Sequence, residues 1–386
     1  MMGKMLMLAS VPSMIGAFNM DNIALLMDKG YEIHVACDFK DRSVWSDEKV
    51  KDLILELKKR GISCHQIDFT RSVSNLKRHR KAYVQTRALL KKEQFDFIHC
   101  HAPIASIIAR YAAHKENCKV IYTCHGFHFY HGAPIQNWIF YPIEKYFSGY
   151  TDILVTINDG DYQIAKNRFH AKKVVKIPGV GLDNEAVHNR FIPKEEKRRE
   201  LGIPKDAFVI LSVGNLYHVK NQDVIIKAVA KIHDKGIYYL IAGEGEKKEE
   251  YQKMIHGYGM EDRIRLIGFR DDISELCYAS DVFAHPSKRE GLGMAPLEAM
   301  AAGLPILTSN VGGINSYSVS GKTGYKYAPD DVWGFAHGIQ KLKNHPGLRK
   351  KMGKYNIKVA KEFDISVARR KMSEVYDMIQ ADADGM

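Results

Sequence analysis

Residues 289–303 read Arg-Glu-Gly-Leu-Gly-Met-Ala-Pro-Leu-Glu-Ala-Met-Ala-Ala-Gly, a glycine-rich loop followed by the pattern of a short helix. Proline stands near the first turn of that helix and glycine at its end, as is usual at helix termini. Free backbone N–H groups and the helix dipole favour an anion at such a start. We expect Glu290 in the loop and Glu298 in the first turn, so that two carboxylates flank a phosphate. We expect the N–H groups of residues 294–297 to hold the anion. The residues of this stretch that we expect to bind the ligand are Gly291, Leu292, Gly293, Met294 and Ala295.

On both sides of this stretch, short apolar segments alternate with helical patterns. Such segments lie at 5–9, 32–37, 64–67, 97–99, 120–124, 153–157, 174–177, 208–213, 238–242, 264–267, 282–284 and 306–308. This alternation implies parallel sheets covered by helices on both faces.

The polar segment 178–205 interrupts the alternation, and we place the domain junction there. We expect a first Rossmann-like domain at 1–190 that binds the acceptor and a second at 191–365 that binds the donor. A helix in 366–386 would pack back on the first domain. In such folds the ligand loops follow the carboxyl ends of the strands.

The composition fits a folded enzyme. The 386 residues are 45% hydrophobic and 26% charged without a low-complexity stretch, which excludes disordered and fibrous proteins. Lys and Arg outnumber Asp and Glu by 57 to 45, and this net charge of +12 suggests an anionic partner. Six cysteines without a Cys-x-x-Cys pair favour reduced thiols in the cytoplasm. We interpret the apolar segment 5–18 as a strand and a loop rather than a signal peptide, and expect no membrane-spanning segment.

The Glu-x7-Glu spacing of Glu290 and Glu298, with Glu-Ala-Met-Ala-Ala-Gly at 298–303, resembles the retaining glycosyltransferases of family 4, which have the GT-B fold. The resemblance implies an α/β protein in which two Rossmann-like doubly wound domains face a central cleft. The other matching pieces are Ser-Val-Gly-Asn-Leu at 212–216, Lys220-Asn221, Ala-Gly-Glu-Gly-Glu at 242–246, Gly-Phe-Arg-Asp-Asp at 268–272 and Gly312-Gly313.

The resemblance also implies roles for individual residues. Glu290 would bind the sugar hydroxyls of a UDP-sugar, and Glu298 would bind the ribose. Lys220 would hold the diphosphate, and the main chain near Arg270 would contact the base. We expect no metal and no cofactor, because Lys220 and the helix start can stabilise the charge on the departing diphosphate.

This chain departs from the family pattern at two places. The family usually has Arg or Glu where this chain has Asn215, so we expect Asn215 to line the donor site while Lys220 supplies the charge. Near Gly313 the family often has an acidic residue, and this chain has Ile-Asn-Ser-Tyr at 314–317 instead.

In the first half, residues 122–131 read Tyr-Thr-Cys-His-Gly-Phe-His-Phe-Tyr-His, and they resemble an element of capsular and exopolysaccharide members of the family. By that match His125 would touch the donor sugar, while Gly16 in the first loop would let the backbone approach the diphosphate. The alternative for His125 is a core histidine with satisfied hydrogen bonds. We expect His128 and His131 to be structural or to line the acceptor site.

Histidine and cysteine side chains are dense over residues 99–131, which raises the question of a metal site. No pair has the spacing of zinc ligands, and strand neighbours such as His99 and Cys100 point to opposite faces. We therefore expect no metal there.

Positive charge is concentrated in the first half, where residues 1–190 hold 27 basic and 19 acidic residues and residues 71–92 hold no acidic residue. We expect a helix over 71–92 whose Leu76, Tyr83 and Leu90 share one face. Such a helix can rest on anionic lipid headgroups, and a solvated helix face explains the pattern equally well. The residues that we assign to acceptor or membrane contact are Arg71, Lys77, Arg78, Arg80, Lys81, His128 and Trp138.

The resemblance implies a retaining glycosyltransferase of cell-surface polysaccharide biosynthesis, capsule or exopolysaccharide, with Glu290, His125 and Lys220 as catalytic residues. It would move a hexose or N-acetylhexosamine from a UDP-sugar to a polyprenyl-diphosphate-linked saccharide. We expect it in the cytoplasm, in peripheral contact with the inner face of the plasma membrane.

Three other functions are alternatives to this one. A UDP-sugar epimerase or a phosphorylase could have the same fold. A nucleic-acid-binding protein would fit the positive charge, but the sequence lacks a recognition helix or an exposed aromatic sheet signature. A dinucleotide oxidoreductase would need Gly-x-Gly-x-x-Gly after the first strand, and that motif is missing.

Overall fold

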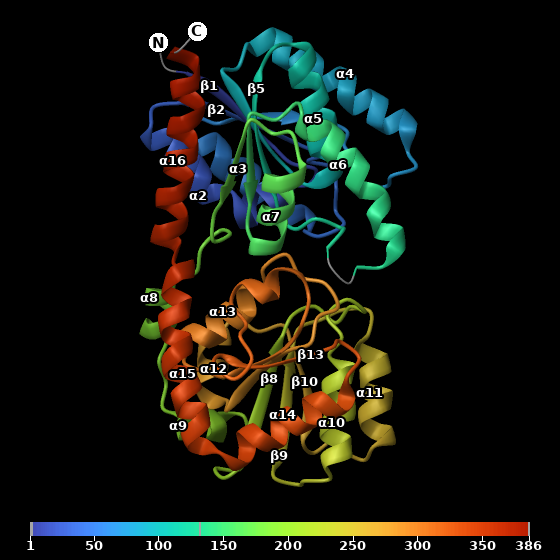
Figure 1. Cartoon of the computed structure of the whole chain (residues 1–386), viewed down its shortest axis with the longest axis vertical. Coiled ribbons are helices and arrows are strands. Elements are labelled where there is room, and N and C mark those ends of the chain that lie inside the picture. Colours follow the sequence, from blue (N-terminus) through green and yellow to red (C-terminus); the bar gives the residue numbers. More distant parts are fainter. Residues whose placement is uncertain (1–2, 131–132, 385–386) are drawn as a thin grey trace. The chain divides into compact units, whose positions relative to one another are not determined.

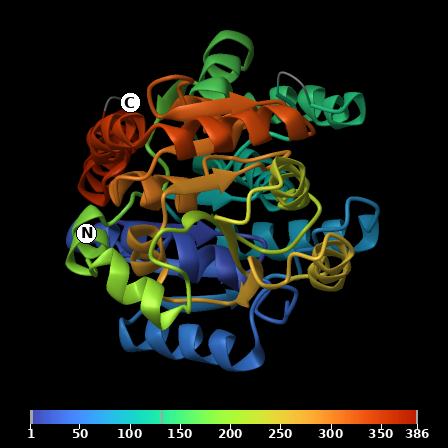
Figure 2. The same ribbon diagram turned by 90° about the horizontal axis from the view of Figure 1, so that it is seen from below.

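The computed structural model describes residues 3–130 and 133–384, and the chain forms two compact units. The first unit comprises Met1–Val180 and Ser366–Met386, and the second comprises Gly181–Ile365. Figures 1 and 2 show that each unit is a sheet with helices on both of its faces.

The first unit contains a seven-stranded parallel sheet in the order β3-β2-β1-β4-β5-β6-β7. The strands carry runs of buried residues, as expected for a sheet covered on both sides. Their bounds are β1 Lys4–Leu8, β2 Glu32–Cys37, β3 Ser63–Gln66, β4 Phe97–His101, β5 Lys119–Cys124, β6 Ile153–Thr156 and β7 Lys173–Lys176.

Helices connect these strands and cover the sheet (Figure 1). They are α1 Pro12–Phe18, α2 Met20–Asp28, α3 Asp47–Lys59, α4 Leu76–Glu93, α5 Pro103–Lys115, η1 Ile135–Ile139, α6 Phe140–Ser148 and α7 Asp159–Arg168.

The C-terminal helix α16, Ile365–Asp384, packs on the first unit although it is far away in the sequence. The buried Tyr376 hydroxyl lies 3.0 Å from Nδ1 of His99 in β4. Lys29, just after α2, forms an ion pair of 2.6 Å with Asp377. These contacts, together with the buried side chains of Met372, Val375 and Ile379, hold the helix on the first unit.

The second unit contains a six-stranded parallel sheet in the order β10-β9-β8-β11-β12-β13. After β8 the chain adds β9 and β10 on one side, and it then adds β11 on the other side of β8, so that β8 and β11 are neighbours. The bounds are β8 Phe208–Val213, β9 Ile237–Ala242, β10 Ile264–Gly268, β11 Val282–His285, β12 Ile306–Ser309 and β13 Gly324–Tyr327. The sequence analysis missed β13, because it is short and only partly buried.

Helices again cover both faces of this sheet, and the apolar face of α10 is fully buried against it. The helices are α8 Asn184–Asn189, α9 Lys194–Glu200, α10 Asp223–Ile232, α11 Lys248–Gly257, α12 Ile273–Ala279, α13 Met294–Ala301, η2 Gly312–Ser316, α14 Val332–Asn344, α15 Pro346–Ala360 and η3 Lys361–Phe363.

The division between the units lies at Val180 and Gly181, ten residues earlier than the boundary expected at 190. The reason is that α8 packs on the second unit: the main-chain carbonyl of Val187 accepts a hydrogen bond from the Tyr278 hydroxyl. Phe191 packs edge-on against the same Tyr278 ring.

Asp281 ties the segment after α8 to the second sheet. Its buried carboxylate accepts hydrogen bonds from Lys194 at 2.6 Å, from Arg198 at 2.7 Å and from the Val209 amide at 2.8 Å. Burial raises the pKa of Asp281, but Lys194 and Arg198 outweigh it and bring the pKa below its usual value.

We expect Asp281→Ala to lower the free energy of unfolding by about 3–5 kcal/mol, because it leaves the buried Arg198 without its anion. Urea denaturation measures this loss. Asp330→Ala is the matched control, since Asp330 is 84% exposed and its ion pair with Lys288 should contribute at most about 1 kcal/mol. Equal losses in the two variants would contradict the role of Asp281. Because the pKa of Asp281 is lowered on folding, its stabilisation should be lost as the pH falls below about 4.

Candidate functional site

The second unit places two loops side by side at the carboxyl edge of its sheet. One loop follows β8 and carries Lys220, and the other follows β11 and carries Glu290. Because the chain turns in opposite directions after β8 and β11, their loops border the crevice in which doubly wound sheets bind ligands.

Lys220 and Glu290 form an ion pair across this crevice, with 2.6 Å between Nζ of Lys220 and Oε2 of Glu290. The same oxygen lies 3.0 Å from Nε2 of His285 and 3.5 Å from Oγ of Ser287. Oε1 of Glu290 accepts no hydrogen bond from the residues that the structure describes. One oxygen is thus held by the protein, and the other is available to a ligand.

The electrostatics keep Glu290 ionised. Burial raises the pKa of Glu290, but the hydrogen bond from His285 and the charge of Lys220 outweigh it and lower the pKa to about 2. Burial lowers the pKa of His285, so its ring is neutral near pH 7 and Nε2 donates its proton to the carboxylate.

Glycines bring the main chain of this loop against its neighbour. The Gly313 amide donates to the Glu290 carbonyl at 3.0 Å, and a Cβ on Gly313 would stand 1.8 Å from the Gly291 carbonyl oxygen. Gly293 precedes α13 with a φ of 86°. Met294 and Ala295 form the first turn of α13, where main-chain N–H groups have no partner within the helix. The phosphate site at this helix start stays a prediction. The Leu292 side chain is buried, which leaves only its main chain for a ligand.

The expectation that Glu298 lies in the first turn of α13 is wrong. Glu298 is the fifth residue of the helix and therefore lies in its second turn. Its carboxylate accepts a hydrogen bond of 2.8 Å from Ser274. Burial raises the pKa of Glu298.

The two remaining donor-side residues lie in loops after β8 and β10, which are separated in the sheet by β9. Asn215 is exposed after β8, and Arg270 follows β10. The Arg270 guanidinium is bound to the Asp272 carboxylate, with Nε at 2.7 Å. This pairing leaves the main chain near Arg270 as the group expected to contact a base.

Tyr317 stands where this chain departs from the family pattern. Its side chain is buried, and its hydroxyl has no hydrogen-bond partner among the described residues. A Cβ on Gly293 would stand 3.1 Å from the Tyr317 hydroxyl and also 3.1 Å from Cγ of Glu290, so both side chains lie beside Gly293. The departure therefore places a neutral hydroxyl, rather than a second acid, close to Glu290.

In the first unit, His125 directly follows β5, and its half-buried ring lies 6.0 Å from the Phe18 ring. Gly16 does not lie in a loop as expected, because the helix α1 already begins at Pro12. A Cβ on Gly16 would stand 2.3 Å from the Trp45 ring, so this glycine makes room for Trp45. Its approach to a diphosphate stays a prediction.

The basic segment at 71–92 is helical only from Leu76, so Arg71 precedes α4. The expected apolar face is wrong in part: Leu76 is 74% exposed, and the buried residues of α4 are Ala82, Thr86 and Leu90. A long run of basic residues at its start leaves few apolar side chains to bury there.

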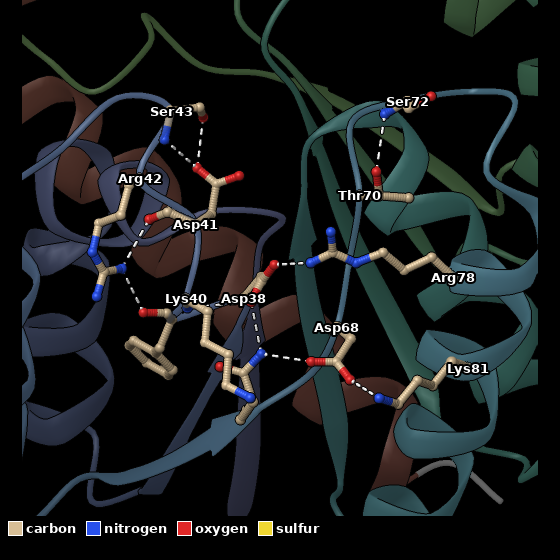
Figure 3. A network of polar contacts seen from close by, with 12 residues as sticks. Asp38, Lys40, Asp41, Arg42, Ser43, Asp68, Thr70, Ser72, Arg78 and Lys81 are labelled. Carbon is tan, nitrogen blue, oxygen red and sulfur yellow. Dashed lines mark hydrogen bonds and ion pairs between the residues drawn. The ribbon is translucent and has the colours of Figure 1, made fainter. Parts of the chain in front are cut away.

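Two of the predicted basic residues are paired with acids at the ends of strands (Figure 3). Arg78 binds the buried Asp38 after β2, and Lys81 binds Asp68 after β3 at 2.6 Å. Gln66 donates to both aspartates, and the hydrogen bonds from Lys81 and Gln66 lower the pKa of Asp68 to about 2. Among the described residues, Lys77 and Arg80 form no ion pair, and Arg71 contacts only the Ser43 hydroxyl at 3.5 Å.

The aromatic segment forms η1 and α6. Trp138 is 38% exposed and packs its ring against Phe129 and Tyr141. The His128 ring lies 4.9 Å from that of Phe140. His131 lies outside the residues that the structure describes.

Within residues 3–130 and 133–384, no three His, Cys, Asp or Glu side chains are placed to hold a metal ion. All six cysteines are free. No helix in the described part of the chain is long and apolar enough to cross a membrane.

Comparison with known proteins agrees with this geometry. The family model described as Glycosyltransferase Family 4 matches residues 20–180, and the model described as Glycosyl transferases group 1 matches residues 193–359. The putative glycosyltransferase EpsD of Bacillus subtilis is 32% identical over 385 residues, which cover 97% of this chain and 96% of EpsD. The chain belongs to glycosyltransferase family 4.

This glycosyltransferase is also 28% identical over 312 residues to the UDP-Gal:alpha-D-GlcNAc-diphosphoundecaprenol alpha-1,3-galactosyltransferase of Escherichia coli, with 78% and 80% of the two chains covered. Among solved structures, HepE of Anabaena in complex with UDP and glucose has a TM-score of 0.76 at 18% identity, over 97% of this chain and 100% of HepE. WaaG, a glycosyltransferase of lipopolysaccharide biosynthesis, has a TM-score of 0.70 at 18% identity, over 96% and 99%. The predicted GT-B fold is confirmed.

Sequence reasoning missed His285 and Ser287, which share the carboxylate oxygen of Glu290 with Lys220 in the glycosyltransferase. Their position at the end of a predicted strand, five and three residues before Glu290, was the available signal. The spacing of residues in a loop does not determine the direction of their side chains. The contacts of His285 and Ser287 with Glu290 therefore depend on the folded structure.

We expect Gly313→Ala to lower the free energy of unfolding by about 1–3 kcal/mol, because the new methyl group must displace the Gly291 carbonyl. Thermal and urea unfolding measure the loss. Gly347→Ala in α15 is the control, since nothing lies within 4 Å of a Cβ there, and it should be neutral or slightly stabilising. Equal stability of the two variants would show that the loop does not depend on Gly313.

Proposed function

We propose that this glycosyltransferase moves a hexose or N-acetylhexosamine from a UDP-sugar to a lipid-linked saccharide, with retention of configuration, in the biosynthesis of cell-surface polysaccharide. The observation that carries the proposal is the Lys220–Glu290 ion pair at the switch point of the second sheet, beside the start of α13. It combines a cation and a helix N-terminus for a diphosphate with an ionised carboxylate for hydroxyl groups.

The donor half of the proposal rests on these two charges. A diphosphate entering the crevice competes with Glu290 for Lys220 and finds further donors in the first turn of α13. Oε1 of Glu290 can then accept a hydrogen bond from a sugar hydroxyl, while His285 keeps Oε2 in place. That HepE was solved with UDP and glucose supports UDP as the carrier.

The reaction exchanges one bond at the anomeric carbon. The bond from that carbon to the diphosphate oxygen breaks, a bond to the acceptor oxygen forms on the same face, and the departing phosphate takes the acceptor proton. Lys220 and the start of α13 stabilise the charge that grows on the diphosphate. The proposal therefore uses protein groups for this charge and needs no metal ion.

The acceptor half rests on the first unit. The relative from Escherichia coli is named for a diphosphoundecaprenol acceptor, which supports a polyprenyl-diphosphate-linked saccharide here. Lys77 and Arg80 lie in the first turns of α4 and Arg71 lies in the loop before it, all three without an acidic partner among the described residues. The helix α4 packs on α5, which packs on α6.

An apolar stripe on η1 and α6 lies on the same helical layer. Its exposed side chains are Ile135, Trp138, Ile139, Ile143 and Tyr146. Basic residues and exposed aromatics together suit the headgroup region of an anionic membrane. We propose that the enzyme works in the cytoplasm and touches the inner face of the plasma membrane through this layer.

A UDP-sugar epimerase or phosphorylase could use the same donor site. Product analysis without an acceptor separates these functions: an epimerised UDP-sugar would indicate the epimerase, and phosphate-dependent products would indicate the phosphorylase.

Glu290→Ala and Lys220→Ala should each lower the turnover of a UDP-sugar at least tenfold, because each removes a group that acts on the reacting donor. UDP release from UDP-glucose, UDP-galactose and their N-acetyl derivatives measures this. The control Lys227→Ala removes a lysine that pairs with Asp223 at 2.6 Å on α10, and it should leave turnover unchanged. Near-normal rates in either site variant would refute the role of that residue.

The triple variant Arg71→Ser, Lys77→Ser, Arg80→Ser should bind anionic vesicles on the order of 100-fold more weakly, at about 1 kcal/mol for each lost charge. Flotation with phosphatidylglycerol–phosphatidylcholine vesicles, and with phosphatidylcholine alone, measures this. The control replaces three exposed lysines of α15, Lys350, Lys351 and Lys354, by serine and makes the same change in charge. Equal flotation of both triple variants, or flotation independent of the anionic lipid, would refute the membrane surface.

A further inference from the structure

A buried histidine connects the first sheet to His125. His101 is the last residue of β4 and is almost completely buried, and its Nδ1 lies 3.0 Å from Nε2 of His125. On the other side of the His101 ring, Nε2 lies 3.2 Å from Sδ of Met7 in β1. This contact bridges β1 and β4, the strands between which the chain direction switches in the first sheet.

The partners of His101 decide where its proton lies. Burial lowers the pKa of His101 well below its usual value, so the ring is neutral and carries a single N–H. The Met7 thioether can accept a hydrogen bond but cannot donate one, so the N–H of His101 belongs on Nε2. Nδ1 of His101 then carries a lone pair, and Nε2 of His125 must supply the proton between the two rings.

We propose that His101 is a positioning residue that fixes His125 as the Nε2–H tautomer, so that Nδ1 of His125 faces the ligand as a hydrogen-bond acceptor. Nδ1 makes no hydrogen bond to any described residue. Burial lowers the pKa of His125 to about 4, which keeps this ring neutral as well. The tautomer follows from contacts within the first unit alone.

The backbone next to His101 supports a special role for this position. Ala102 has a φ of 71°, a conformation that residues with a side chain rarely adopt. Such strain persists where the surrounding structure holds it, and it is frequent at functional sites. Here it lies between the end of β4 and the start of α5, directly after the ring that orients His125.

The tautomer has a consequence for the ligand, which rests on the proposed function. The cavity beside His125 is lined by Phe18, Asn19 and Asn22, by Arg369 and Met372 of α16, and by Asp21, so its charged groups are one acid and one base. A neutral ring with an outward lone pair attracts a hydroxyl group and repels a carboxylate oxygen. We therefore infer a neutral hexose or N-acetylhexosamine, and not a uronic acid, as the transferred sugar.

His99 provides a matched control within the same strand. Its ring is as buried as that of His101, but its nitrogens contact the Tyr376 hydroxyl at 3.0 Å and the Thr123 hydroxyl at 2.8 Å. It makes no hydrogen bond to His125. Its loss should therefore affect stability without changing the protonation of His125.

Nitrogen NMR of protein labelled with 15N-histidine tests the tautomer directly, with His125→Gln identifying the signals of His125. We expect native His125 to show a protonated Nε2 and an unprotonated Nδ1. His101→Leu should abolish this preference, His101→Gln should keep it because the amide oxygen can accept from Nε2–H, and His99→Leu should keep it. A protonated Nδ1 in the native protein, or equal changes in His99→Leu and His101→Leu, would overturn the proposal.

Kinetics test the consequence for the donor. With whichever of UDP-glucose, UDP-galactose or their N-acetyl derivatives is hydrolysed, His101→Leu should raise KM about 5- to 10-fold, the effect of one hydrogen bond, and His101→Gln should restore most of the loss. Preference for UDP-glucuronate over all neutral donors would overturn the inferred sugar class. If the native protein turns over no UDP-sugar, the proposed function fails, while the NMR result still decides the tautomer.

Discussion

The ion pair between Lys220 and Glu290 is the contact on which the functional part of the second unit depends. Two loops that are 70 residues apart in the sequence meet there, because β8 and β11 are neighbours at the point where the chain changes direction. The main chain of the Glu290 loop also packs closely against residues 312–313, and Gly312 and Gly313 permit this approach because a Cβ at either position would meet the main chain of that loop. In return, the pair keeps two opposite charges at the carboxyl edge of the sheet.

The first unit repeats this arrangement with neutral groups. In its sheet, too, the direction in which successive strands are added reverses between β1 and β4, and Met7 and His101 are in contact there. Where the second unit uses a charged pair, the first uses a buried ring bonded to His125. One topology thus supplies an ionised carboxylate in one unit and a histidine of defined tautomer in the other, and both suit sugar hydroxyls.

The net charge of +12 acquires a clearer meaning in the folded chain. Asp38 and Asp68 neutralise Arg78 and Lys81 at the ends of β2 and β3, so these two bases serve the sheet edge. Arg71, Lys77 and Arg80 lie close by in the sequence, and among the described residues they form no ion pair. The segment that looked like one uniform basic helix therefore divides into a paired part and a part that faces outward.

The sequence alone determined the α/β class and nearly all the strands, because buried runs, glycine-rich loops and helix starts depend on local patterns. Glu290, Lys220 and His125 stay predictions as site residues. The sequence did not determine that Gly16 lies in a helix, that Glu298 lies in the second turn, or that His285 binds Glu290. It also did not show that Tyr376, near the end of the chain, reaches His99. These features depend on contacts between residues that are distant in the sequence or on the direction of side chains, and only packing in the tertiary structure decides them.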